Sequence, residues 1–222
     1  MQNANITAHL SAIGARMREK GLYPYIETDH SALSPLFEQV GKEKVHPMSS
    51  VSEKELGDGK AFWLFLQKEG RSIACISAKL IELGRGDFGS YMSGLASSRY
   101  ERASKVVSNV AQPLIDEMSG RMIYFGGIEF AADQKGSVRL LGDFAQYAKL
   151  TSALRWEFDW MYTIIAYRHR RLADDYGFHW RLRNAIHWSD PVPEGLANDH
   201  MVLATNPAHF FHVLGSVKPG EL

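Results

Sequence analysis

The segment from Met122 to Ala166 most constrains how this chain can fold. It holds an apolar run at 122–132, apolar residues spaced three and four apart from Leu140 onward, and a second apolar run at 160–166. A long amphipathic helix between two short buried strands predicts a βαβ unit. The two strands should be parallel neighbours in one sheet, since a right-handed crossover joins them.

The turn between the first strand and the helix is a candidate anion site. It contains Lys135 and Gly136 and directly precedes the helix. The first N–H groups of a helix lack backbone partners and lie at the positive end of its dipole, so they favour an anion. Glycine lets the backbone approach a ligand closely, and lysine adds a positive charge. We interpret this turn as a phosphate cradle.

These residues resemble the GNAT superfamily of acyl-CoA-dependent N-acyltransferases. Its members hold the coenzyme A pyrophosphate on a V-x-P-x-x-R-G-x-G-x-G segment, over which FAADQKGSVRL (130–140) lies here. The segment RRLADDYGF (170–178) lies over the family's next helix and its closing G-F. The resemblance runs from about Ala61 to the C-terminus. It implies an α/β (α+β) fold: a mixed, mostly antiparallel sheet with one parallel pair joined by a long helix, and helices on both faces.

The resemblance also implies a co-substrate and an acceptor. The co-substrate would be acetyl-CoA or another acyl-CoA, and the acceptor a small-molecule amine. The residues that it places at the coenzyme A site are Phe130, Ala131, Ala132, Gln134, Lys135, Gly136, Ser137, Val138, Arg139 and Leu140.

Glu129 is the first candidate for the catalytic base. Apart from Tyr124 it is the only ionisable residue in the run 122–132. A carboxylate in an apolar strand is costly unless it is paired or used, and desolvation would raise its pKa toward the working range of a base. The alternative is an ion pair with Arg121, Arg139 or another arginine, or a solvated strand edge.

Gly126 and Gly127 have two interpretations. They mark either the bulge at which the parallel strands separate to admit pantetheine, or close packing beneath an aromatic ring. In the first case a backbone N–H near Phe130 or Ala131 would stabilise the oxyanion.

Tyr176 is the candidate general acid. The family's usual tyrosine, four residues before the closing glycine, is Ala173 here, and Val138 and Leu140 replace two cradle glycines. These substitutions support a second hypothesis, a catalytically degenerate GNAT-like domain that binds a ligand or partner. The leading hypothesis remains an acyl-CoA-dependent N-acyltransferase, most simply an acetyltransferase.

Composition narrows the partners and the compartment. The 25 lysines and arginines balance the 25 aspartates and glutamates, which argues against nucleic acid and membrane partners. A single cysteine, Cys75, in an apolar run and no signal-peptide pattern indicate the cytoplasm. No metal is expected, because His209 and His212 form H-x-x-H without an acidic or cysteine cluster beside it.

The other elements surround the βαβ unit in one domain, 1–222. The segment at about 84–120 should be a helical insertion that covers the acceptor cleft, forms a homodimer contact or packs as an accessory pair. Candidate acceptor contacts are His30, Glu38 and His46, with surface positions as the alternative, and the four histidines in or near the C-terminal strands, His187, His200, His209 and His212. Further expected elements are a helix at about 7–20, an edge strand at 22–27, a helix at about 31–40, a hairpin of 61–67 with 72–83, and strands at 180–188 and 200–205.

Overall fold

The computed structural model describes residues 2–100, 106–134, 138–194 and 196–222. Its helices are α1 (Gln2–Arg18), α2 (Leu33–Val40), α3 (Glu53–Gly57), α4 (Phe88–Tyr100), α5 (Gln112–Glu117), α6 (Val138–Arg155) and α7 (Pro207–Ser216). Its strands are β1 (Leu22–Glu27), β2 (Ala61–Lys68), β3 (Arg71–Glu82), β4 (Val107–Val110), β5 (Arg121–Phe130), β6 (Trp160–Ala166), β7 (Trp180–Arg183), β8 (Ile186–Trp188) and β9 (His200–Thr205).

The described strands form a seven-stranded sheet in the order β1-β2-β3-β5-β6-β9-β7. The β5–β6 pair is parallel, and the other pairs of this sheet are antiparallel. Helix α6 joins the two parallel strands, as the sequence predicts. The mixed, mostly antiparallel fold class is therefore confirmed.

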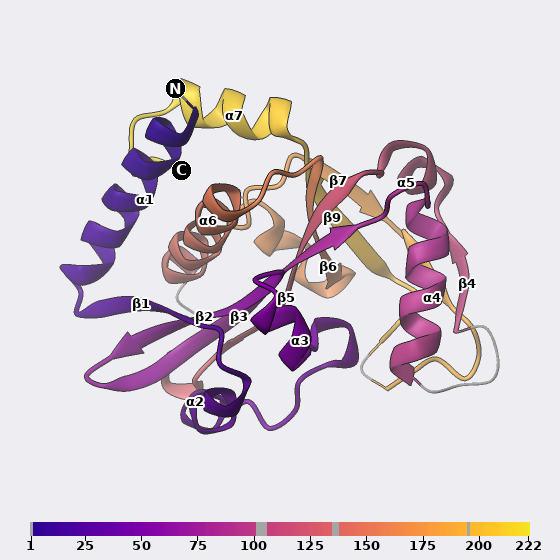
Figure 1. Cartoon of the computed structure of the whole chain (residues 1–222), viewed down its shortest axis with the longest axis horizontal. Coiled ribbons are helices and arrows are strands. Elements are labelled where there is room, and N and C mark those ends of the chain that lie inside the picture. The colour runs from indigo at the N-terminus through magenta and orange to yellow at the C-terminus, as the bar shows by residue number, and fades with distance from the viewer. Residues whose placement is uncertain (1, 101–105, 135–137, 195) are drawn as a thin grey trace.

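Helices cover both faces of the sheet (Figure 1). On one face α1, α6 and α7 bury their apolar side chains in the largest core cluster. On the other face α4, α5 and the β4–β8 ribbon enclose a second cluster, and α2 and α3 pack on a third. Strand β2 explains the division, because Phe62 and Leu64 face the first cluster while Trp63 and Phe65 face the third. No helix among the described residues is both long and apolar enough to cross a membrane.

Local signals set the N-terminal elements where the sequence predicts them. Strand β1 lies at the sheet edge and contains Pro24, which lacks the N–H that an inner strand needs. Asp29 accepts a hydrogen bond from the Ser31 N–H ahead of α2. Gly41 ends α2 in the left-handed conformation, with φ of +79°.

The C-terminal elements differ from the prediction. The strand expected at 180–188 is divided into β7 and β8, which belong to different sheets, because Asn184 between them has φ of +52°. After the strand expected at 200–205, the chain forms helix α7, which carries His209 and His212 and is not among the expected elements. Asn206 caps this helix and Pro207 occupies its first turn, which are helix-start signals in the sequence.

Three further expectations need correction. The insertion at about 84–120 is not purely helical, since it contributes β4, which pairs with β8. The helix expected at 170–178 is a short 3-10 helix, η4 (Tyr167–Ala173), followed by a turn at Gly177 with φ of +63°. The N-terminal helix begins earlier than expected, at Gln2.

Strands β5 and β6 separate at a bulge. Their pairing ends at Phe125 with Thr163, whose Oγ1 donates to the Phe125 carbonyl at 2.8 Å. Between two pairings with β3, those of Gly126 and Glu129, β5 has two residues where β3 has one. Gly127 has φ of +65°, and a Cβ there would lie 2.9 Å from the Trp63 ring. The glycine pair therefore forms a bulge and also packs beneath an aromatic ring.

Replacing Gly127 with alanine should lower the free energy of unfolding by about 2–4 kcal/mol. The positive φ and the close approach to Trp63 both penalise a side chain at this position. Urea denaturation measures the effect. The matched control is Gly94→Ala in α4, where an added Cβ meets no heavy atom within 4 Å, and where stability should rise by about 0.5–1 kcal/mol. Equal effects of the two substitutions would contradict a strained bulge.

Candidate active site

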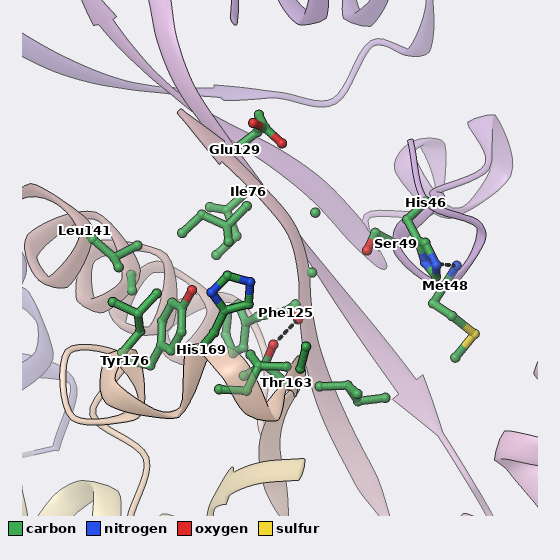
Figure 2. Close-up of a pocket in the computed structure, with 18 of the residues that line it drawn as sticks. His46, Met48, Ser49, Ile76, Phe125, Glu129, Leu141, Thr163, His169 and Tyr176 are labelled. Atoms are coloured by element: carbon green, nitrogen blue, oxygen red, sulfur yellow. Dashed lines mark hydrogen bonds between the residues drawn. The ribbon is translucent and has the colours of Figure 1, made fainter. Parts of the chain in front are cut away.

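A cavity of about 670 Å³ lies where β5 and β6 separate (Figure 2). Residues 128–130 of β5 and 164–166 of β6 line it from the two separated strands. Leu141 and Ala145 of α6 line it on one face of the sheet, and Ser49 and His46 line it on the other. The cavity therefore reaches both faces of the sheet through the gap between the strands.

The directions of the β5 N–H groups show which of them can donate a hydrogen bond to a ligand in the gap between β5 and β6. The Ala131 N–H donates to the Ile73 carbonyl at 2.8 Å, and the Glu129 N–H is directed at the Cys75 sulfur. Because N–H groups alternate in direction along the regular part of a strand, that of Phe130 faces the side from which β6 has diverged. Of the two oxyanion donors expected near the strand end, Ala131 is thus already bonded to β3, and Phe130 is directed at the cavity.

Glu129 lines the cavity from the bulged part of β5 (Figure 2). Its side chain is half-buried rather than enclosed in an apolar strand. The neighbouring Cys75 is fully buried, and burial raises the pKa of its thiol to about 12, with the Lys42 charge opposing the rise and Glu129 adding to it. Cys75 is therefore a buried thiol of low reactivity, whereas the carboxylate of Glu129 borders the cavity.

Tyr176 lines the cavity from the α6 side, beside Leu141 and His169 in Figure 2. Burial, followed by the nearby charge of Asp175, raises the pKa of its phenol to about 12. The phenol therefore keeps its proton at neutral pH and acts as a hydrogen-bond donor. Ala173, at the family's usual tyrosine position, is fully buried in the core.

The residues predicted to bind coenzyme A have different environments. Phe130 and Gln134 line the cavity, whereas Ala131 and Leu140 belong to the hydrophobic core and Ala132 and Arg139 are exposed. Three of the predicted residues lie outside the described part of the chain, as does the side chain of Val138. These three are Lys135, Gly136 and Ser137. The described structure shows α6 beginning at Val138, directly after them.

The histidines divide between the cavity and other places. His46 and His200 line the cavity, whereas His209 and His212 lie on α7. His46 accepts the Met48 N–H at Nδ1, at 3.3 Å, and Nε2 lies 3.3 Å from the Tyr100 hydroxyl. Burial, and then the charges of His200 and Lys42, lower the pKa of His46, so its ring is neutral near pH 7. No group of three or more metal-ligating side chains occurs among the described residues.

Lys42, Ser49 and Lys149 line the cavity, and sequence reasoning missed them. The Lys42 Nζ donates to the Gly127 carbonyl at 3.0 Å, and Ser49 hydrogen-bonds to Tyr124. Lys42 and Ser49 lie in or near the connection after α2, where no periodic pattern indicates which side chains are buried or face a site. Lys149 did carry a signal, because it follows Leu141 and Ala145 at spacings of four on the same helix face.

Lys149 holds the turn that carries Tyr176. Its Nζ donates to the carbonyls of Tyr176 and Gly177, at 3.2 and 2.6 Å, and lies 4.6 Å from the centre of the Phe178 ring. The side chain is only 3% exposed, and burial lowers its pKa to about 7. The Lys149 amine thus connects α6 to the segment after η4 through two backbone carbonyls.

Replacing Lys149 with methionine should destabilise the fold more at high pH than at low pH. The folded-state pKa of Lys149, about 7, lies below its unfolded value, so the unfolded chain binds more protons and wild-type stability rises from about pH 7 to about pH 10. The variant lacks this rise, at most about 1.4 kcal/mol per pH unit. Urea denaturation of both proteins across this range measures the difference, with the exposed Lys54→Met as control. If the stability difference between the wild type and Lys149→Met did not change with pH, the lowered pKa of Lys149 would be contradicted.

Comparison with known proteins gives structural similarities alone. No family model matches this chain, and no curated protein matches it. Among solved structures it is similar to a polyamine N-acetyltransferase of Drosophila melanogaster, with a TM-score of 0.46 and 10% identity, over 83% of this chain and 99% of that chain.

Two other solved structures are similar over comparable lengths. A spermidine/spermine N-acetyltransferase, SpeG of Vibrio cholerae, gives a TM-score of 0.45 and 12% identity over 87% of this chain and 98% of that chain. FeeM, an N-acyl amino acid synthase from uncultured soil microbes, gives a TM-score of 0.46 and 10% identity over 85% of this chain and 92% of that chain. On its strand order, its parallel pair joined by α6 and its separated β5 and β6, the chain has a GNAT-like fold.

Proposed function

We propose that this protein is an acyl-CoA-dependent N-acyltransferase that acylates the amino group of a small molecule. The cavity between the separated strands β5 and β6 carries this proposal. An extended ligand could pass through the sheet at this cavity, beside a β5 N–H group that no longer faces β6. Helix α6 begins close to one end of β5, so its N-terminal N–H groups favour an anion there.

The residues of the cavity fit an acyl-CoA. Ile128 and Ile164 supply apolar walls for a pantetheine arm between the strands, and Gln134 supplies a polar side chain near the start of α6. The first turn of α6 would hold the pyrophosphate, together with Lys135 and Gly136, which lie outside the described residues. When bound, the acyl-CoA supplies a thioester, the activated acyl group of the reaction. An acetyl group is the simplest acyl group for this site.

Each group has a role in the transfer. The N–H of Phe130 would hold the thioester carbonyl oxygen and stabilise the negative charge that develops on it. Glu129 would take the proton from the attacking amine, directly or through a water molecule. The amine nitrogen bonds to the carbonyl carbon, and the carbon–sulfur bond breaks. Tyr176, with its raised pKa, would donate a hydrogen bond to the departing thiolate while water supplies the final proton.

A GNAT-like module without turnover is the second candidate. The observation in its favour is that Ala173, at the position of the family's usual tyrosine, lies in the core. The proton-donor role would then fall to Tyr176, which lines the cavity from another position. Such a module would bind coenzyme A and release no thiol from acyl-CoA in the presence of amines. Measuring binding and turnover on the same preparation separates the two candidates.

Ala166→Trp should abolish coenzyme A binding. Ala166 lines the cavity at the end of β6, so an indole ring there would fill the gap between the strands. Isothermal titration with coenzyme A and acetyl-CoA should give saturable binding for the wild type and none for this variant. Ala4→Trp, on an exposed position of α1, controls for the added ring, and circular dichroism controls for folding. Unchanged affinity in Ala166→Trp would place the ligand elsewhere.

Glu129→Gln should lower kcat/KM by about 10²–10³-fold, since a general base contributes roughly that much. The affinity for coenzyme A should stay within about twofold, because the proposed role is proton transfer. Thiol release, followed from pH 6 to pH 10, should show the loss shrinking at high pH, where the amine is already deprotonated. Glu157→Gln, an exposed partner of Arg121, is the matched control. A rate within about threefold of the wild type would rule out Glu129 as the base.

A further inference from the structure

We infer that the acyl acceptor carries a carboxylate, or a similarly compact oxyanion, beside its amino group, and that Lys42 and Lys44 bind this anion. The inference rests on the proposed function and specifies its acceptor. It assigns the site to an amino acid or a related amino carboxylate rather than to a polyamine.

The charge of the cavity is the first argument. Among the described residues that line it, Lys42, Lys44 and Arg168 carry positive charge, whereas Glu129 is the carboxylate. Lys149 adds no full charge near neutral pH, because burial lowers its pKa. A polyamine with several ammonium groups would meet like charges in this cavity, and an anion would meet opposite ones.

The positions of the lysines are the second argument. Lys42 and Lys44 belong to the connection between α2 and residue 49, on the sheet face opposite to α6. The proposed phosphate site lies at the start of α6, so these two lysines are placed on the acceptor side of the gap.

Lys42 is held in place at the bulge. Its Nζ donates to the Gly127 carbonyl at 3.0 Å and lies 5.9 Å from the centre of the Trp63 ring. An ammonium has three N–H donors, so this bond leaves further donors for a ligand. Gly127 is two residues from Glu129 along β5. A carboxylate bound by Lys42 would therefore leave a neighbouring amino group close to the proposed base.

Nearby acidic side chains do not supply a cation site in the cavity. The Glu27 carboxylate accepts from the N–H groups of Thr28 and Asp29 and from the Tyr25 hydroxyl. The Asp29 carboxylate accepts from Ser31. Neither residue lines the cavity. These carboxylates accept hydrogen bonds within the turn after β1 and lie outside the cavity.

The test compares matched acceptors. The wild type is incubated with acetyl-, butyryl- and octanoyl-CoA and with three pools: the common L-amino acids, their amides, and spermidine, putrescine and agmatine. Thiol release and product masses are recorded, and coenzyme A binding is measured separately. Acylation of amino acids should exceed that of their amides by about tenfold or more.

The variants probe the two lysines. Lys42→Ala and Lys44→Ala should each lower the preference for acid over amide about three- to tenfold, the size expected of a partly exposed ion pair. Lys44→Glu should shift the preference toward amides. Coenzyme A affinity should stay unchanged in all three. Lys54→Ala, an exposed lysine on α3 outside the cavity, should behave as the wild type.

The outcomes separate the inference from the proposed function. The inference is overturned if coenzyme A binds but amino acids are not acylated, if amides or polyamines are preferred, or if the lysine variants keep the wild-type preference. Failure to bind coenzyme A overturns the proposed function and this inference with it.

Discussion

The separation of β5 from β6 is the constraint on which the site depends. The parallel pair is held together only as far as Phe125 and Thr163, and the bulge at Gly126 and Gly127 then turns β5 away. Inner strands of a sheet rarely leave backbone groups unpaired, because burying them without partners costs free energy. Here a cavity borders the Phe130 N–H, which β6 no longer meets. The same distortion positions the carbonyl of Gly127 to hold Lys42 and presents Glu129 to the cavity.

Helix α6 forms one wall of the cavity between β5 and β6 and is bound to the segment after η4. Leu141 and Ala145 form the cavity wall on one helix face, and Lys149 continues that face into the core. By donating to the carbonyls of Tyr176 and Gly177, Lys149 binds the turn after η4 to the helix. The position of the Tyr176 ring is therefore coupled to α6, although the two are far apart in sequence.

Burial sets the proton state of most groups around the cavity. It raises the pKa of Cys75 and Tyr176, so both keep their protons, and it lowers the pKa of His46 and Lys149. Each shift favours the uncharged form. Charged groups therefore remain at the half-buried and exposed positions of the cavity, where ligands enter, and the charge that a ligand meets there is determined by few side chains.

The sequence alone determined the βαβ unit, the parallel pair, the edge position of β1 and the β2–β3 hairpin, because each rests on local periodicity or on turn residues. It also singled out Glu129 and Tyr176, which both line the cavity, although their proposed roles remain predictions. Tertiary structure alone decided that β8 leaves the main sheet to pair with β4, and that α7 packs against α1. It also brought Lys42, Ser49 and Lys149 to the site. Lys42 and Ser49 carry little sequence signal, because their role depends on which distant backbone groups the folded chain places opposite them, whereas Lys149 follows the periodicity of α6.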